Sequence, residues 1–263
     1  MPEILSDAEL FQVNPFDSGI ARANSSYAAF KTDTLVRVLD PDQPPTALME
    51  LVHDVFRALV LSPRFSCVGA KAAFHKGDYR MGMYGEMNTA ETNAGLARDL
   101  FTFVQERVQL QSNFTTFIAS FTGPYPADEV DFERLLWQQL QGLHELDAPL
   151  HRWDASVSSD PEESTFSFSF AETAFFVIGL SPASSRWTRR FAWPTLVFNA
   201  HAQFEQLREN GTYTSIQTAI RAREEALQGR NDFLSDFGEQ SEARQYAGRN
   251  VEANWHCPFH PHR

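Results

Sequence analysis

The stretch "TFSFSFAETAFFVIGL", residues 165–180, decides the fold of this chain. Its first part alternates Phe with Ser, which is the period of a strand that has one buried face. From residue 175 to residue 180 it is wholly apolar, as in a strand that other layers cover on both faces. We therefore expect an interior strand of a sheet here, with the rest of the chain packed around it.

Helix-like and strand-like segments follow one another in irregular order along the rest of the chain. Strand-like runs cover 78–87, 114–121 and 193–200, and helix-like runs cover 46–61, 94–110, 127–146 and 200–210. Irregular mixing of this kind is typical of α+β proteins. We predict an α+β fold in which helices pack on a mostly antiparallel sheet. It forms a single domain over residues 1–263, from which about 20 N-terminal and about 5 C-terminal residues extend.

The first helix-like run has a recognisable start and an expected buried face. Thr46 can cap the helix, and the two Pro residues before it end whatever precedes. Its large apolar residues recur at intervals of three and four, which places them on one side of a helix. The face that we expect to be buried consists of Leu48, Leu51, Val52, Val55 and Leu59.

The composition limits the kinds of partner and ligand that this chain is expected to bind. The chain has 22 Lys and Arg against 34 Asp and Glu, a formal net charge of -12. This balance disfavours nucleic acid and anionic membranes as partners and favours a small cationic ligand. No apolar run approaches the roughly 18 residues of a membrane span, and the N-terminus lacks the basic and apolar regions of a secretory signal, so we expect a cytoplasmic protein. The 23 Phe residues either line a flat apolar cavity or build an aromatic core.

His201 is the first candidate for a metal ligand, because the common motifs of nucleotide, zinc-protease and hydrolase sites are missing. On the helix expected over 200–210, it shares one face with Phe204, Glu205 and Arg208. A carboxylate that holds one ring nitrogen leaves the lone pair of the other nitrogen for a metal. The spacing alone, however, favours a simple surface pair of His and Glu.

Cys67 and Cys257 are the alternative metal ligands. They are the only cysteines, and neither lies in the CxxC spacing of a zinc or redox site. A thiolate binds metals strongly, but a buried cysteine more often packs as a small apolar side chain. On the residues alone, the packing role is therefore favoured for both.

Arginines cluster in two places of this acidic chain. Arg186 and Arg190 lie in "SSRWTRRF", and Arg244 and Arg249 flank Tyr246 in "EARQYAGR". The planar guanidinium group binds carboxylates with two parallel hydrogen bonds. These side chains therefore either hold the acid groups of a ligand or pair with neighbouring Asp and Glu, and composition favours neither role.

The C-terminal third of the sequence resembles the YqcI/YcgG family. Four motifs follow in the order of the family and near its spacing: "LVFNAHAQFEQLRENGTY", "IRAREEALQG", "FLSDFGEQSEARQYAGR" and "WHCPF". Upstream, "FSCVGAKAAFHKGDYRMGMY" is similar to the "FPC…GKAA…G.YR" region of the family, and "SPASSRWTRRF" to its "HP…SR..RRF" region. The resemblance thus runs from about Phe65 to the C-terminus.

The chain departs from the family pattern at two positions. Ser181 and Pro182 stand where the family has His-Pro, and Ser66 stands where it has Pro before the cysteine. If the His of His-Pro binds the metal in the family, this chain lacks that ligand. A protein that keeps the fold without a cofactor and serves as an interaction partner is therefore one alternative.

Characterised members of the family are b-type haem proteins that oxidise nitrogen, either as N-hydroxylases of guanidines or amines in natural-product pathways or as an oxygenase of 2-aminoimidazole. The resemblance implies a haem-dependent N-oxygenase that uses O₂ or peroxide, with an electron donor where needed. Its substrate would be a small cationic nitrogen compound, oxidised to a level between hydroxylamine and nitro. A haem-binding sensor or carrier is the alternative, and the sequence leaves a monomer and a homodimer open.

The same resemblance assigns roles to particular residues. It implies His201 as the axial ligand of haem b iron, with Cys257 and Cys67 as alternatives. The residues expected to anchor the haem propionates or to enclose the haem are Arg186, Arg190, Arg244, Tyr246 and Arg249.

Overall fold

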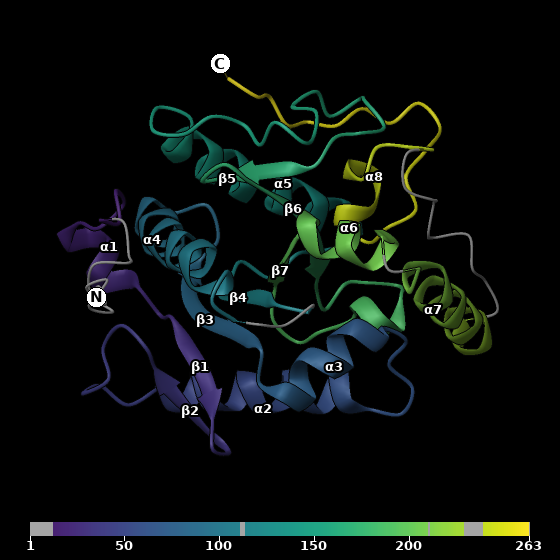
Figure 1. The fold of residues 1–263 in the computed structure, drawn as a ribbon. Helices are drawn as coiled ribbons and strands as arrows, with labels where there is room; N and C mark the ends of the chain where they lie inside the picture. Colours follow the sequence, from purple (N-terminus) through teal and green to yellow (C-terminus); the bar gives the residue numbers. More distant parts are fainter. Residues whose placement is uncertain (1–12, 111–113, 210, 229–238, 263) are drawn as a thin grey trace, which may run out of the picture.

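The structure, a computed structural model, describes residues 13–110, 114–209, 211–228 and 239–262. It contains one sheet in the order β2-β1-β3-β4-β7-β6-β5 (Figure 1). The strands are β1 (Ala28–Lys31), β2 (Thr34–Arg37), β3 (Tyr79–Glu86), β4 (Thr116–Gly123), β5 (Phe168–Phe170), β6 (Thr173–Leu180) and β7 (Thr195–Ala200). The helices are α1 (Gly19–Asn24), α2 (Ala47–Leu61), α3 (Val68–Lys76), α4 (Ala90–Arg107), α5 (Glu129–Asp147), α6 (His201–Glu209), α7 (Tyr213–Gln228) and α8 (Ala243–Tyr246).

The sheet consists of two antiparallel groups joined along one parallel pair. β2, β1 and β3 form the first group, and β4, β7, β6 and β5 form the second. β3 and β4 run parallel, and α4 crosses between them over the sheet, because parallel neighbours need a long connection. The predicted α+β domain with a mostly antiparallel sheet is thus confirmed.

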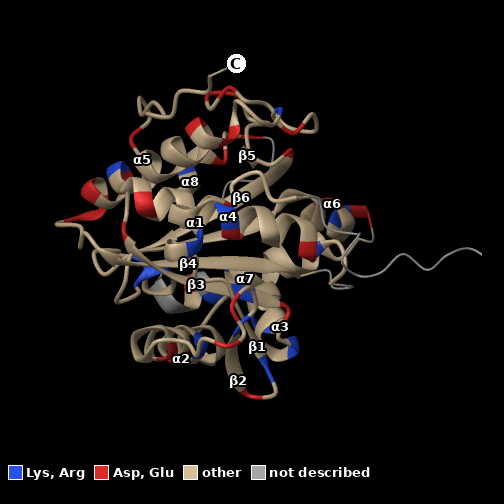
Figure 2. Cartoon of the chain, turned by 90° about the vertical axis from the view of Figure 1, so that its left-hand side faces the viewer, with Lys and Arg blue, Asp and Glu red and all other residues tan. Residues whose placement is uncertain are grey.

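Helices cover both faces of the sheet (Figure 1). On one face, α2 and α3 pack against side chains of β3, β4, β6 and β7 in one apolar cluster. On the other face, α4 and α5 pack against the aromatic side chains of β4, β5, β6 and β7. Charged residues lie mostly along the outer helices and loops, as Figure 2 shows. Among the residues that the structure describes, no helix combines the length and the apolar character needed to cross a bilayer.

The interior strand predicted from residues 165–180 is β6. It pairs with β5 on one side and β7 on the other, and the apolar run that begins at Phe175 is mostly buried. Ala171 and Glu172 connect β5 to β6 with φ of 49° and 55°, the left-handed backbone of a tight hairpin turn. Local patterning was therefore sufficient for this part of the sheet.

The predicted buried face of α2 is wrong, although Thr46 caps the helix as expected, accepting a hydrogen bond from the Met49 amide at 3.2 Å. Of the expected set, Leu48, Leu51 and Val55 are exposed, Leu51 to 52%. The buried side chains are Met49, Val52, His53, Phe56 and Val60. Both sets have helical spacing and overlap only at Val52, so periodicity could not choose between them. The buried face is the one that carries the aromatic rings of His53 and Phe56 and the thioether of Met49, because these larger side chains fill the space between α2 and the sheet.

The described C-terminal residues, up to residue 262, contact α5. Phe259 is buried among aromatic rings, and the His260 amide donates to Gln141 of α5 at 3.0 Å. At the other end, the first twelve residues of the expected N-terminal extension lie outside the described residues.

Candidate functional site

An apolar cleft of about 260 Å³ lies between the sheet and helices α3, α6 and α7. Side chains of β4, β6 and β7 form its floor, among them Ile118, Ile178 and Val197. Rings from several elements form its walls: Phe56, Phe65, Phe74, Phe114, Phe176, Phe204 and Tyr213. The Phe residues of this chain therefore serve both purposes considered above, because others fill the core on the opposite face of the sheet.

Arginines enter the apolar cleft from two sides. Arg186 and Arg189 are buried and come from the loop after β6, where residues 187–189 form a short 3-10 helix. Arg189 donates from Nη1 to the carbonyl of Gly179 at 3.1 Å, which fixes its position against β6. Arg208 of α6 lies over the ring of Tyr213 with its guanidinium carbon 4.5 Å from the centroid. Of the arginines predicted as site residues, Arg186 is the one that the structure places in the cleft.

Cys67 also lines the cleft, at the N-terminus of α3. It is the N-cap residue, and its Sγ accepts a hydrogen bond from the amide of Ala70 at 3.4 Å. Its sulfur atom therefore lies at a helix N-terminus on the wall of the cleft.

His201 begins α6 and is buried beside the cleft between two carboxylates. Its Nδ1 lies 3.8 Å from Oε1 of Glu205, so the predicted shared helical face is present. Its Nε2 lies 3.6 Å from Oε1 of Glu242, which lines the cleft. The sequence did not predict Glu242, which lies in "GEQSEARQ" close to the candidate residues Arg244 and Tyr246. It reaches His201 because α8 packs on β6.

Tyr246 is buried in the core and does not line the cleft. Its hydroxyl donates to the carbonyl of Phe175 and accepts from the amide of Phe168, both at 3.0 Å. These two residues face each other across β5 and β6, so the hydroxyl bridges the two strands. Burial raises the pKa of Tyr246 well above its usual range. Its position indicates a structural role.

The remaining predicted arginines also contact protein groups away from the cleft. Arg190 donates to the carbonyl of Ser184 at 2.8 Å. Arg244 donates to the carbonyls of Trp255 at 3.1 Å and Glu252 at 2.6 Å, and so holds the C-terminal segment. Arg249 pairs with Glu133 of α5 at 2.8 Å. The positions of these three arginines thus do not support the expectation that they anchor a ligand in the cleft.

A comparison with protein families matches residues 56–260 to the model described as the YqcI/YcgG family. The chain belongs to the YqcI/YcgG family. All the residues named above as cleft lining lie within the matched range, whereas α1, β1 and β2 lie outside it. Searches of the curated proteins and of the solved structures found no match.

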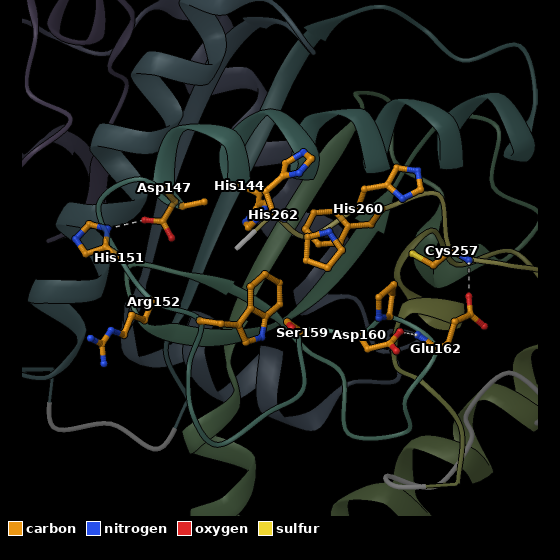
Figure 3. Close-up of a pocket in the computed structure, with 15 residues that line it drawn as sticks. His144, Asp147, His151, Arg152, Ser159, Asp160, Glu162, Cys257, His260 and His262 are labelled. Atoms are coloured by element: carbon orange, nitrogen blue, oxygen red, sulfur yellow. Dashed lines mark hydrogen bonds and ion pairs between the residues drawn. The ribbon is translucent and has the colours of Figure 1, made fainter.

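This YqcI/YcgG protein has a second cavity, of about 660 Å³, at the end of α5 (Figure 3). Asp147 and His151, paired at 2.7 Å, lie at one end, and Cys257 and Glu162 lie at the other. Although it is larger than the apolar cleft, this cavity is lined by both polar and apolar side chains, which come from the end of α5 and from the segments 148–162 and 257–262. Within the described ranges, no group of three or more His, Cys, Asp and Glu side chains could hold a metal ion.

Cys257 lines this second cavity and not the apolar cleft. Burial raises its pKa to about 12, which disfavours a thiolate at neutral pH. Of the two cysteines, Cys67 is therefore the one that lines the apolar cleft.

Proposed function

We propose that this protein is a haem-dependent N-oxygenase whose haem binds in the apolar cleft. The observation that carries the proposal is the presence, in one cleft, of aromatic walls, the Cys67 thiol and the buried Arg186. A porphyrin is a flat apolar group with carboxylates at one edge, and thiolate is a known haem ligand. The oxidation of nitrogen is taken from the resemblance to characterised members of the family.

The chemical types of the lining residues suit haem, but the cleft would have to widen to hold a porphyrin. Its volume of about 260 Å³ lies just below the range of about 300–1,000 Å³ typical of small-molecule sites. Helix α7 is the wall that would move outward, because none of its described side chains is buried. Tyr213, Ile216 and Ile220 of α7 face the cleft and would cover a bound porphyrin.

We propose Cys67 as the iron ligand and retain His201 as the alternative. Cys67 lines the cleft directly, whereas Nε2 of His201 faces Glu242. Arg186 would pair with a propionate, and the aromatic walls would exclude water. Haem would supply the activation of O₂ or peroxide and the delivery of one oxygen atom to nitrogen. The other oxygen atom leaves as water, with electrons and protons from an external donor when O₂ is the oxidant.

The test is the visible spectrum of purified protein supplied with haem, reduced and exposed to CO. We expect a thiolate-type CO spectrum in the wild type and in Cys257→Ala, and its loss in Cys67→Ala. Cys257→Ala is the matched control, because it removes the other thiol from outside the cleft.

Other spectra would change the proposal in defined ways. A histidine-type CO spectrum that His201→Ala abolishes would move the ligand to His201. Haem that binds but cannot take up CO would favour a sensor or carrier. Wild-type protein that takes up no haem would contradict the proposal. The proposal also places the protein in the cytoplasm, with a small cationic substrate.

A further inference from the structure

We infer that His144 of α5 is a pH-sensitive switch, which holds the end of the C-terminal segment 257–262 against the second cavity and releases it in acid. This cavity of about 660 Å³ shares no described lining residue with the apolar cleft, so the inference is independent of the proposed function. His144 lines the cavity from α5, and the C-terminal segment lines it from the other side. The two meet at the end of that segment.

A hydrogen bond between the main chain and an imidazole ring joins them. The backbone amide of His262 donates to Nε2 of His144 at 2.9 Å. Nε2 accepts this bond only as an unprotonated nitrogen, so the neutral ring carries its proton on Nδ1. A second proton turns Nε2 from an acceptor into a donor, and two N–H groups then face each other. The closed arrangement therefore requires a neutral His144.

Burial makes the ring resist protonation while the segment is closed. His144 is 3% exposed. Its ring lies 5.6 Å from that of Trp153, 5.3 Å from that of Phe259 and 6.1 Å from that of His262, measured between centroids. Burial lowers the pKa of His144 from its ordinary value of 6.5, because the surrounding rings exclude the water that would solvate the charge. The imidazole of His262 lowers this pKa further.

Two carboxylates of α5 lie close to His144 along the helix. Glu145 is exposed to solvent, which screens its attraction for a charged ring. Asp147 accepts hydrogen bonds from the amide of Ala171 at 3.0 Å and from Nδ1 of His151 at 2.7 Å. The nearer acceptors on α5 are thus exposed or already bonded, and they compensate little for the lost bond to His262.

The other elements around the cavity contribute charges of both signs. The ionisable groups that line it from these elements, besides His151, are Arg152, Asp160, Glu162, Cys257, His260 and His262. The two carboxylates accept hydrogen bonds from main-chain amides, Asp160 from Glu162 at 3.0 Å and Glu162 from Cys257 at 3.1 Å. Protonated imidazoles of His260 and His262 would repel a protonated His144. The charges on the segment itself therefore favour release.

Release concerns the end of the segment and not the part that anchors it. Phe259 is 1% exposed among aromatic rings. Gln141 of α5 accepts from the amide of His260 at 3.0 Å and donates to its carbonyl at 3.1 Å. Neither anchor titrates, so both stay in place when His144 is protonated. Residues 261 and 262 then leave the cavity wall, and the cavity opens on that side.

The direction of the pH effect follows from the two states of the ring. Above the ordinary pKa of 6.5 the ring is neutral in both states, and the segment stays closed. As the pH falls below this value, the released form binds the proton more tightly than the closed form. The ratio of released to closed chains therefore rises by up to about tenfold per pH unit. The rise ends at the lower pKa of the closed form.

Nuclear magnetic resonance of protein labelled with ¹⁵N only in histidine tests the inference between about pH 7.5 and about pH 5. The chain has 8 His, and His262→Ala identifies the amide signal of residue 262. We expect this amide to lose its protection from solvent exchange in step with protonation of the His144 ring. His144→Gln supplies an uncharged acceptor that does not titrate, and should keep the protection over the whole range. His144→Ala removes the acceptor and should lose it at every pH.

The matched control is His75→Gln, which removes an exposed histidine of α3 and should behave as the wild type. Protection of the His262 amide that persists to about pH 5 in the wild type would overturn the inference. The same pH-dependent loss in His144→Gln would also overturn it and assign the effect to another group, such as the imidazole of His262. So would a global change in circular dichroism over this range.

If the His144 variants fail to fold, the wild type decides. The amide of His262 and the ring of His144 must then change with one midpoint, and separate midpoints contradict the switch. The measurement needs no haem, so its outcome and that of the haem proposal are read separately.

Discussion

The hydroxyl of Tyr246 should contribute to the stability of the fold and not to ligand binding. It is 0% exposed and bridges the carbonyl of Phe175 and the amide of Phe168. Tyr246→Phe leaves the ring in its contacts with Trp137 at 5.5 Å and Phe176 at 5.6 Å, measured between centroids. The substitution therefore removes two buried hydrogen bonds and little else.

The expected magnitude follows from those two bonds. A buried polar group without a partner costs about 1–3 kcal/mol, and a carbonyl with a second lone pair costs less than an amide. We expect Tyr246→Phe to lower the free energy of unfolding by about 2 kcal/mol, which in a domain of this size lowers Tm by about 4–8 °C. Because burial holds the pKa of Tyr246 well above its usual range, the loss should not depend on pH near neutrality.

Urea unfolding followed by circular dichroism measures this difference. Tyr213→Phe is the control, because Tyr213 is half-buried in the cleft wall and should change the free energy by less than about 0.5 kcal/mol. Haem uptake should be unaffected by Tyr246→Phe. A loss below about 0.5 kcal/mol, or a loss of haem with unchanged stability, would refute the structural role given to this hydroxyl.

The other predictions concern stability and can use the same unfolding assay. Arg249→Met should cost about 3 kcal/mol, because it leaves the buried carboxylate of Glu133 unpaired, and adding Glu133→Gln should recover much of the loss. Gly179→Ala should cost about 2 kcal/mol or more, since its methyl group would lie within 3.0 Å of α5 side chains and the α8 backbone, whereas Gly19→Ala, with nothing within 4 Å, should not destabilise. Burial raises the pKa of Asp99 from 3.8 to about 6, so the folded state binds the extra proton and stability should fall as pH rises through that window; Asp99→Asn should remove this slope.

Local sequence patterns predicted helices and strands more reliably than they predicted contacts between distant residues. The period of residues 165–180 identified β6, and the spacing of His201 and Glu205 identified a real helical face. Both inferences use neighbours within a few residues. The buried face of α2 failed because the sequence contains two helical stripes, and the sheet that selects one of them is distant along the chain.

The candidate site depended on contacts that no local pattern contains. Arg249 and Glu133 are separated by 116 positions, so their pairing could not be read from either segment. The two cysteines were equivalent in sequence, and only packing separates them, because α3 presents Cys67 to the cleft while Cys257 is buried beside α5. Glu242 became a candidate site residue only because the fold places it beside His201.

The parallel pair β3–β4 has a consequence for the cooperativity of unfolding. It joins two antiparallel groups, and the cleft takes walls from both: α3 precedes β3, whereas the floor belongs to β4, β6 and β7. A ligand can bind only while both groups are in place, so binding stabilises the whole domain and not one group. Amide hydrogens of β1, none of whose residues lines the cleft, should then exchange more slowly with solvent when ligand is added, in step with those of β6. The two groups of strands would open together as one unit.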